Sequence, residues 1–354
     1  MRTCICLYSG GLDSSLAIAL MVRQGVRVIA FHAVSAFSPS SDSEEGRQRL
    51  EDRCRRLGAV HMACRDITAA QIAMVRTPRY GRGRNLNPCL DCHIEMLRQA
   101  AEILRETAAD FLVSGEVLGQ RPMSQRREAL QIIDRHLQDW GLEGRLLRPL
   151  SAKLLPPTLP ESEGWIAREA LKDFQGRNRK PQLALARELG VEGYNTPAGG
   201  CLLTDMGFAS RLRDLLACEP DFTIDDVLLL RIGRHHRLDS ACKAVSSRCE
   251  EENRRLQELA RPGDRLFLTA QRPGAIVLLR CRQPGAENCE TAGRIAAGLA
   301  VYFSKFRYAG RADVWCWQAG KGESTKKLLP ACSAISPQQL LQTMTRCEAI
   351  VGAT

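Results

Sequence analysis

The 354-residue sequence predicts an α/β protein, a doubly wound parallel sheet followed by a smaller α+β domain. Two observations predict the sheet. Short apolar runs alternate with helical segments over the first part of the chain, and a loop rich in glycine and serine joins the first run to the first helix. A third observation, three prolines within residues 153–160, marks a linker. We therefore expect a domain at 1–155, a helical linker with a cysteine loop at 156–222, and a second domain at 223–345.

The elements follow in order. Strands of the first domain are expected where short runs are apolar throughout, as in strands buried on both faces: 3–8, 26–31, 60–64, 110–114 and 146–150. Helices are expected at 14–24, 47–57 and 94–108, the first two closed by Gly25 and Gly58, and helical pieces at 169–189. The second domain should hold strands at 232–238, 265–268, 275–281 and 312–317, with helices at 249–260 and 291–302.

Charge and cysteine content narrow the class of protein. Fifty Lys and Arg against 40 Asp and Glu give a formal charge of +10, which favours acidic partners, nucleic acid first. No apolar run approaches a membrane span, and no leader-like segment is recognised, so we expect a cytoplasmic protein without a membrane partner. Fifteen cysteines, an odd number, then argue against a disulfide framework. Most, including Cys242, Cys281 and Cys289, show no metal-binding spacing and are interpreted as structural thiols.

The glycine- and serine-rich loop predicts a phosphate site. It comprises Ser9, Gly10, Gly11, Leu12, Asp13, Ser14 and Ser15, directly between the first strand and the first helix. Glycines let backbone approach a phosphate, and the amides at a helix N-terminus favour the anion. Asp13 can hold a magnesium ion that bridges phosphates. The lack of a following lysine and of a G-x-G-x-x-G pattern excludes the usual P-loop and dinucleotide motifs.

This loop resembles the PP-loop of the N-type ATP pyrophosphatases. The resemblance implies a Rossmann-like adenine nucleotide alpha hydrolase fold, and cleavage of ATP to AMP and pyrophosphate with adenylation of a substrate oxygen. Residues 115–125 resemble a segment of the tRNA 4-thiouridine synthetases, which adds Gly115 and Gln120 to the expected ATP site.

Three cysteines are singled out as functional. Cys89 and Cys92 are spaced so that both thiolates can reach one metal, and the helix N-terminus that follows is expected to lower their pKa. Cys201 follows Gly199 and Gly200. The Asn87–Pro88–Cys89 motif resembles the tRNA 2-thiouridylases, whose second catalytic cysteine corresponds in order and setting to Cys201. His93 is interpreted as a surface residue.

Two sulfur mechanisms are open. Either Cys201 carries a persulfide that Cys89 resolves through a transient disulfide, or Cys89, Cys92 and Cys201 bind a 4Fe-4S cluster whose fourth iron holds the sulfide. The second is favoured, because the first does not use Cys92. Asp13, Cys89 and Cys201 are the expected catalytic residues.

Basic segments suggest where RNA binds. Four arginines and Tyr80 lie within nine residues ahead of the cysteine motif, and three more arginines lie beside the segment of Gln120. The set is Arg76, Arg79, Arg82, Arg84, Arg121, Arg126 and Arg127, with a second basic run at Arg177, Arg179 and Lys180. Residues 225–330 resemble the NFACT RNA-binding domain through segments 250–253, 262–264, 273–277, 296–304 and 326–327. Residues 233–237 are expected to form an RNA-contacting strand rather than a metal site.

Together these features predict ATP-dependent thiolation of a tRNA uridine at O2 or O4. The expected cofactors are ATP, Mg²⁺ and a 4Fe-4S cluster. The expected partners are tRNA and a sulfur donor, whether a cysteine desulfurase, a sulfur carrier or free sulfide. The alternatives are a PP-loop ligase or amidotransferase acting on a small molecule, and an RNA-binding protein with an inactive PP-loop.

Overall fold

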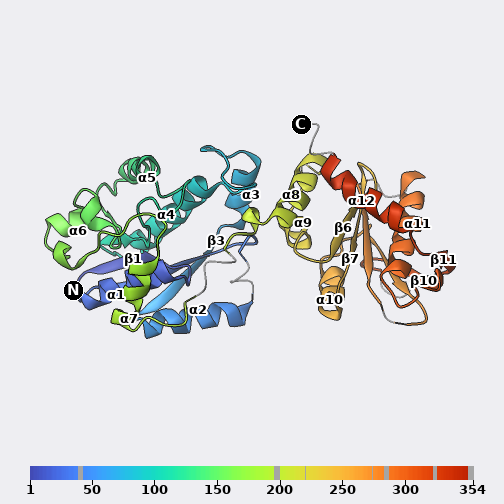
Figure 1. Cartoon of the computed structure of the whole chain (residues 1–354), viewed down its shortest axis with the longest axis horizontal. Helices are drawn as coiled ribbons and strands as arrows, with labels where there is room; N and C mark the ends of the chain where they lie inside the picture. Colours follow the sequence, from blue (N-terminus) through green and yellow to red (C-terminus); the bar gives the residue numbers. More distant parts are fainter. Residues whose placement is uncertain are drawn as a thin grey trace. The chain divides into compact units, whose positions relative to one another are not determined.

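The computed structural model describes residues 1–38, 43–194, 200–219, 221–272, 274–282, 287–321 and 325–349. The chain divides into two compact units, Met1–Asp205 and Met206–Thr354 (Figure 1). Each unit has its own sheet and its own hydrophobic core, and each is described by itself.

The first unit is built on five parallel strands: β1 (Thr3–Leu7), β2 (Arg27–Val34), β3 (His61–Asp66), β4 (Phe111–Val113) and β5 (Leu146–Leu147). Their order in the sheet is β3-β2-β1-β4-β5, and every pairing is parallel. The predicted doubly wound sheet is therefore confirmed. Because the chain adds β2 on one side of β1 and β4 on the other, the winding reverses beside β1.

Helices cover both faces of this sheet, which explains why β1 is apolar throughout (Figure 1). Cys4 and Cys6 of β1 pack in one core with α1 (Leu12–Arg23) and α7 (Lys180–Leu189). Ile5 and Leu7 point the other way, into a core with α4 (Cys89–Glu106) and α5 (Arg127–Asp139). Two further helices, α2 (Glu44–Arg56) and α3 (Thr68–Arg76), complete the unit, together with the short α6 (Leu159–Ser162).

The segment predicted as a linker, 156–222, is shared between the two units. Its first part packs on the first sheet: the Phe174 amide donates to the Leu150 carbonyl at 2.8 Å, and the Gly176 amide donates to the Leu118 carbonyl at 2.7 Å. Its last part contains α8 (Met206–Cys218), which belongs to the second unit.

The second unit is α+β, as predicted. Its sheet runs β11-β10-β8-β9-β7-β6 with antiparallel pairings. The strands are β6 (Arg234–Arg237), β7 (Cys242–Ser246), β8 (Arg265–Thr269), β9 (Val277–Cys281), β10 (Arg311–Gln318) and β11 (Lys327–Ser333). The helices are α8, α9 (Ile224–Leu229), α10 (Glu250–Glu258), α11 (Glu287–Tyr302) and α12 (Pro337–Ala349), and α11 packs across the sheet. Within the described residues of both units, we find no helix with the length and apolar character needed to span a membrane.

Candidate active site

The phosphate loop occupies the position in the first sheet where ligands bind most often. It follows the carboxyl end of β1, between β2 and β4, where the strand order reverses. Gly10 adopts a left-handed backbone (φ 74°), which favours glycine. Helix α1 begins at Leu12 after Gly11, which has no side chain to cap the helix. The amides of the first turn are thus left without a side-chain cap, as in helices that bind phosphate.

The serines hold the loop in shape. The hydroxyls of Ser14 and Ser15 both donate to the Gly11 carbonyl, at 3.0 and 2.9 Å. The Ser9 and Ser14 hydroxyl oxygens lie 3.2 Å apart, and the Ser9 amide donates to Ser14. These bonds fix the loop before any ligand arrives, so a phosphate would meet a formed cradle.

Asp13 has one carboxylate oxygen engaged and one that has no partner. Its Oδ2 accepts a hydrogen bond from Gln120 Nε2 at 2.8 Å and lies 3.7 Å from the Arg179 guanidinium. Its Oδ1 is buried without a hydrogen-bond partner in the protein. Mg²⁺ prefers oxygen ligands such as carboxylates. The buried, unpartnered Oδ1 of Asp13, next to the glycine- and serine-rich loop, therefore fits that ion.

Gly115 lets the end of β4 approach the phosphate loop closely. A Cβ atom built on Gly115 would lie 2.7 Å from the carbonyl carbon and oxygen of Asp13 and from the Ser14 nitrogen. All three are backbone atoms, which cannot swing aside. The structure thus brings Gly115 and Gln120 to Asp13, which lies more than 100 residues before both of them in the sequence.

The three predicted cysteines also converge within the first unit. Cys89 is the first residue of α4, and Cys92 lies in the next turn. The loop before α4 holds the segment of Cys201: the Leu86 amide donates to the Leu203 carbonyl at 3.3 Å, and Asn85 Nδ2 donates to the Thr204 carbonyl at 2.8 Å. Gln71 Nε2 lies 2.9 Å from Cys92 Sγ. Residues 195–199, which include Gly199 of the predicted motif, lie outside the described residues.

The expected lowering of the cysteine pKa values is wrong. Burial, with smaller contributions from neighbouring Cys201 and Cys89, raises the pKa of Cys92 to about 12 despite the lowering effect of a hydrogen bond from Gln71. Burial, with a contribution from Cys89, raises the pKa of Cys201 to about 11. Burial also raises the pKa of Cys89, although Arg121 and Asn87 oppose it. Desolvation is the largest cause for all three thiols, and a bound cation would favour their thiolate forms.

A buried charge network that sequence reasoning missed joins the two parts of the site. His93 Nε2 lies 3.1 Å from Glu116 Oε1, and Arg148 Nε donates to Glu116 Oε2 at 2.9 Å. Burial alone would raise the pKa of Glu116, but the charges of His93 and Arg148 bring it well below its ordinary value. His93 is mostly buried, so the expectation of a surface histidine is wrong. Glu116 follows Gly115 and His93 follows Cys92, so the network spans from the phosphate loop to the cysteines.

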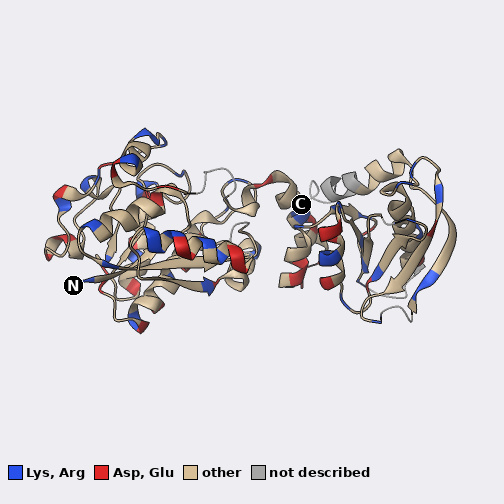
Figure 2. Cartoon of the chain, turned by 90° about the horizontal axis from the view of Figure 1, so that it is seen from below, with Lys and Arg blue, Asp and Glu red and all other residues tan. Residues whose placement is uncertain are grey.

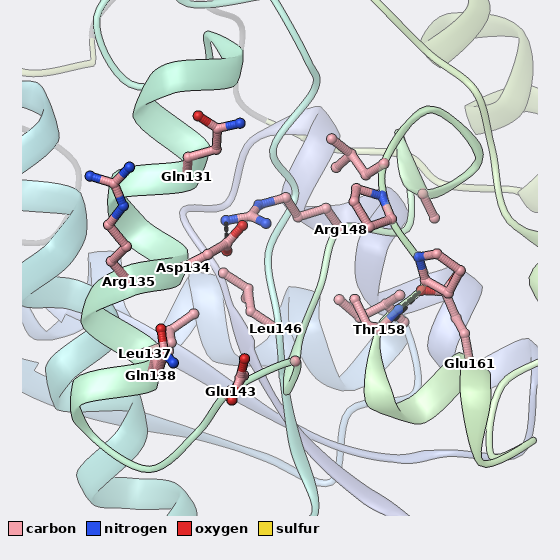
Figure 3. A pocket seen from close by; sticks show the side chains of 16 residues that line it. Gln131, Asp134, Arg135, Leu137, Gln138, Glu143, Leu146, Arg148, Thr158 and Glu161 are labelled. Atoms are coloured by element: carbon pink, nitrogen blue, oxygen red, sulfur yellow. Dashed lines mark hydrogen bonds and ion pairs between the residues drawn. The ribbon is translucent and has the colours of Figure 1, made fainter.

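The outer end of this network faces a surface pocket of about 490 Å³ beside α5 (Figure 3). Figure 3 shows Arg148 directed at Asp134, to which it donates at 2.9 Å. The pocket is lined by residues of 131–161 and by none of the phosphate-loop or cysteine residues, so we do not assign ATP to it.

The predicted RNA-binding arginines of the first unit are exposed: Arg76, Arg79, Arg82, Arg84, Arg121, Arg126 and Arg127. The Arg79 guanidinium lies 5.4 Å from the centre of the Tyr80 ring, and the Tyr80 hydroxyl lies 2.9 Å from His136 Nε2. Arg82 donates to the Val75 carbonyl at 2.8 Å. Arg179 is half-buried and faces Asp13, which fits the phosphate site better than an RNA surface.

The predicted RNA-contacting strand of the second unit is wrong for most of its residues. In β6, His235, His236 and Arg237 are buried, and only Arg234 is exposed. Arg237 donates to both carboxylate oxygens of Asp214 in α8, at 2.9 and 2.7 Å. This strand is thus part of the interior.

Two protein-family sequence models match this chain, one within each structural unit. Residues 1–151 match the sequence model of the family described as thiamine biosynthesis protein (ThiI), and residues 233–333 match that of the NFACT protein RNA binding domain. Both predicted resemblances, to PP-loop tRNA thiolases and to NFACT RNA-binding domains, are confirmed.

Known relatives match part of this chain. The chain is 30% identical over 176 residues to the tRNA-specific 2-thiouridylase MnmA of Synechocystis sp., covering 47% of this chain and 48% of the relative. It is 31% identical over 126 residues to the "Probable tRNA sulfurtransferase" of Methanosarcina mazei, covering 33% and 28%. The chain therefore spans about half the length of these relatives or less. A solved 4-thiouridine synthetase–RNA complex with bound ATP is 21% identical with a TM-score of 0.34, covering 54% of this chain and 52% of that one.

Proposed function

We propose that this chain is an ATP-dependent tRNA sulfurtransferase. The observation that carries the proposal is that one unit combines a preformed phosphate loop, containing an unpartnered Asp13 oxygen, with a group of three cysteines. The match of residues 1–151 to the ThiI family and the names of the relatives support tRNA as the substrate, and the NFACT match supports RNA binding.

The first step is adenylation of a uridine oxygen, O2 or O4. The oxygen attacks the α-phosphorus of ATP, a P–O bond forms, and the bond to pyrophosphate breaks. The Ser9–Ser15 loop and the α1 amides would hold the phosphates, with Asp13 positioned by Gln120. Asp13 Oδ1 would hold Mg²⁺, which neutralises phosphate charge when it is bound. Exposed Arg76, Arg79, Arg82, Arg84, Arg121 and Arg127 would contact the tRNA backbone.

The second step replaces AMP by sulfur: a C–S bond forms at the activated carbon, and the C–O bond to AMP breaks. Cys89, Cys92 and Cys201 would bind a 4Fe-4S cluster, which supplies the sulfur for this transfer when it is loaded. The three thiols are half-buried and influence one another's pKa, which fits this role, since metal binding offsets the raised pKa values. In the alternative, a Cys201 persulfide attacks, Cys89 breaks the S–S bond, and an external reductant must then reduce the Cys89–Cys201 disulfide.

One reconstitution experiment tests both steps. The full chain, purified anaerobically, is incubated with ATP, Mg²⁺ and unmodified tRNA, with sulfide in one reaction and with cysteine and a cysteine desulfurase, which can deliver persulfide sulfur, in a second, and AMP and thionucleosides are measured. We expect AMP and 2-thiouridine or 4-thiouridine in comparable amounts. ATP–pyrophosphate exchange without RNA would instead indicate a small-molecule ligase, and no ATP turnover with tRNA would indicate an RNA-binding protein with an inactive loop.

Cys92→Ser separates the two sulfur mechanisms. It should abolish both the iron content and the thionucleoside if a cluster is used, while AMP formation persists. It should leave thiolation intact if the persulfide mechanism operates. The exposed thiol Cys64 in the same unit provides the matched control, because Cys64→Ser should change neither readout.

A further inference from the structure

The second unit contains another group of three cysteines, which the sequence spacing did not indicate. Cys242 begins β7, Cys281 ends β9, and Cys289 lies in the first turn of α11. Their sulfur atoms all lie within 4.8 Å of one another, and the Cys242 and Cys281 sulfurs are 2.7 Å apart. Throughout the described ranges, no other trio of His, Cys, Asp or Glu ligand atoms is this compact.

The backbone of each cysteine is held independently. Cys242 and Cys281 are directly opposite in the β7–β9 ladder, and the Arg282 amide donates to the Ala241 carbonyl at 2.9 Å just beyond them. Asp239 Oδ1 accepts hydrogen bonds from the Ala241 and Cys242 amides, both at 2.7 Å. The Cys289 carbonyl accepts a hydrogen bond from Arg265. Three sulfurs that converge from two strands and a helix, each on an anchored backbone, form a preorganised donor set.

The chemistry of this donor set suits one soft ion. Thiolates bound to a single zinc ion at about 2.3 Å lie about 3.8 Å apart. The three sulfurs all lie within 4.8 Å of one another, and the Cys242 and Cys281 sulfurs, now 2.7 Å apart, would have to separate by about 1 Å to bind the ion. Burial raises the pKa of Cys242 to about 11, and burial and the two neighbouring thiols raise the pKa of Cys281 strongly. Without a cation these groups are crowded neutral thiols, whereas an ion takes up their charge on deprotonation.

We propose that Cys242, Cys281 and Cys289 form a zinc site that ties the β7–β9 edge to α11. Binding forms three Zn–S bonds and releases three thiol protons to solvent. Asp239 stays outside the ligand set, because its Oδ1 is used by the two amides and its Oδ2 by Asn288. Cys281 is only partly buried, so a water molecule or an added ligand can take the fourth position. The site is independent of the proposed thiolation.

The test measures metal and not enzymatic activity. The full chain carrying Cys89→Ser, Cys92→Ser and Cys201→Ser removes the competing thiols of the first unit. Purified under reducing conditions and supplied with Zn²⁺, it should retain about one zinc ion per chain after gel filtration, by elemental mass spectrometry. With Co²⁺ instead, it should develop the near-ultraviolet absorbance of thiolate-to-cobalt charge transfer.

Adding Cys281→Ser to this background should reduce both signals by about tenfold or more, because one of three protein ligands is lost. Cys281 is chosen because it is partly exposed, and a far-ultraviolet circular dichroism spectrum checks that the variant folds. Cys316→Ser, a partly buried cysteine on β10 of the same unit, is the matched control and should retain the zinc. Zinc that is absent from the background chain, or unchanged by Cys281→Ser, overturns the proposal. So does a Cys242–Cys281 disulfide found by peptide mapping in the freshly purified, metal-free chain.

Discussion

At the residue scale, the geometry of the proposed phosphate site depends on two positions, Asp13 and Gly115. One carboxylate oxygen of Asp13 accepts a hydrogen bond from Gln120, and the other is buried without a partner. That second oxygen is available to bind a cation. Gly115 has no room for a Cβ, because the backbone of Asp13 and Ser14 lies where that atom would be. Asp13 contributes negative charge, whereas Gly115 allows two backbone segments to lie close together. We therefore expect substitution of Asp13 to reduce activity and substitution of Gly115 to reduce stability.

Asp13→Asn should leave the fold intact and reduce tRNA-dependent AMP formation by about a hundredfold or more, since it removes the charge that holds the metal. Radiolabelled AMP release at saturating ATP measures the effect. Asp139→Asn, an exposed acid at the end of α5, is the matched control and should behave like the wild type. Undiminished AMP release by the Asp13 variant would remove this residue from the proposed mechanism.

Gly115→Ala should instead reduce stability by about 1–3 kcal/mol, because the added methyl group meets backbone atoms at 2.7 Å. It should also weaken ATP binding, since the phosphate loop must move to relieve the clash. Urea unfolding and calorimetric ATP titration measure the two effects. Gly200→Ala adds the same methyl group to open space and should leave the unfolding midpoint unchanged. Equal midpoints for both variants would show that the close approach is not needed.

At the scale of elements, packing gives some side chains a different environment from the one their local sequence predicts. Helix α4 begins at Cys89, five residues earlier than predicted, and the thiols that its N-terminus was expected to activate are partly buried, which raises their pKa. Strand β6 reads as basic and exposed, yet Arg237 is fully buried against Asp214 of α8. In both elements the packing partner comes from a distant part of the chain.

The α8–β6 ion pair should be costly to break. Asp214→Asn leaves the Arg237 charge buried with only partial compensation from Glu219, so we expect a loss of about 3–5 kcal/mol. Chemical unfolding followed by circular dichroism measures the loss. Asp221→Asn, an exposed acid that follows α8, should change stability little. A loss as small as that of the control would mean that water replaces the missing partner.

The same pair should make the second unit sensitive to acid. Burial alone would raise the pKa of Asp214, but Arg237 and Lys243 lower it below the ordinary value of about 3.9. The folded pKa is below the unfolded one, so the stabilisation is complete above about pH 4 and is lost as the pH falls further. Unfolding midpoints measured against pH should therefore converge for the wild type and Asp214→Asn at the acid end. A constant difference would contradict this assignment.

At the scale of the whole molecule, the +10 charge is spread over two units rather than concentrated in one segment. Figure 2 shows basic and acidic residues interleaved along helices of the first unit. Arg55 and Glu51 of α2 form one such ion pair. Arginines paired in this way contribute little net field. The loop of 76–87 differs, because its arginines have no acidic neighbour within the loop.

Neutralising this loop should reduce the salt dependence of tRNA binding. For the Arg79→Ala/Arg84→Ala chain we expect the slope of log affinity against log salt to fall by about one per arginine. Filter binding or fluorescence anisotropy over a salt series measures the slope. Arg98→Ala removes an exposed arginine that is paired with Glu95 and Glu102, and should leave the slope unchanged. Equal slopes for all three proteins would place the RNA contact elsewhere.

The sequence alone determined those features that depend on neighbours along the chain. Buried strands, the phosphate loop at a strand–helix junction and the Cys89–Cys92 spacing are local patterns, since a few consecutive residues set their conformation. The α/β and α+β classes follow from the order of such segments. Helices α3, α5, α8, α9 and α12, and strands β7 and β11, were not predicted. The strands and the helices α3 and α9 are short, but the 13-residue α5 carries its apolar residues at helical spacing and could have been recognised from the sequence.

Only the tertiary structure decided which distant side chains meet and which become buried. It placed Gln120 on Asp13, paired Glu116 with His93 and Arg148, and brought together Cys242, Cys281 and Cys289 from three elements. It also reversed the expected thiol pKa shifts and moved Arg237 from the surface to the interior. The physical reason is that desolvation and ion pairing depend on the solvent exposure and spacing of groups far apart in sequence, which no local pattern encodes.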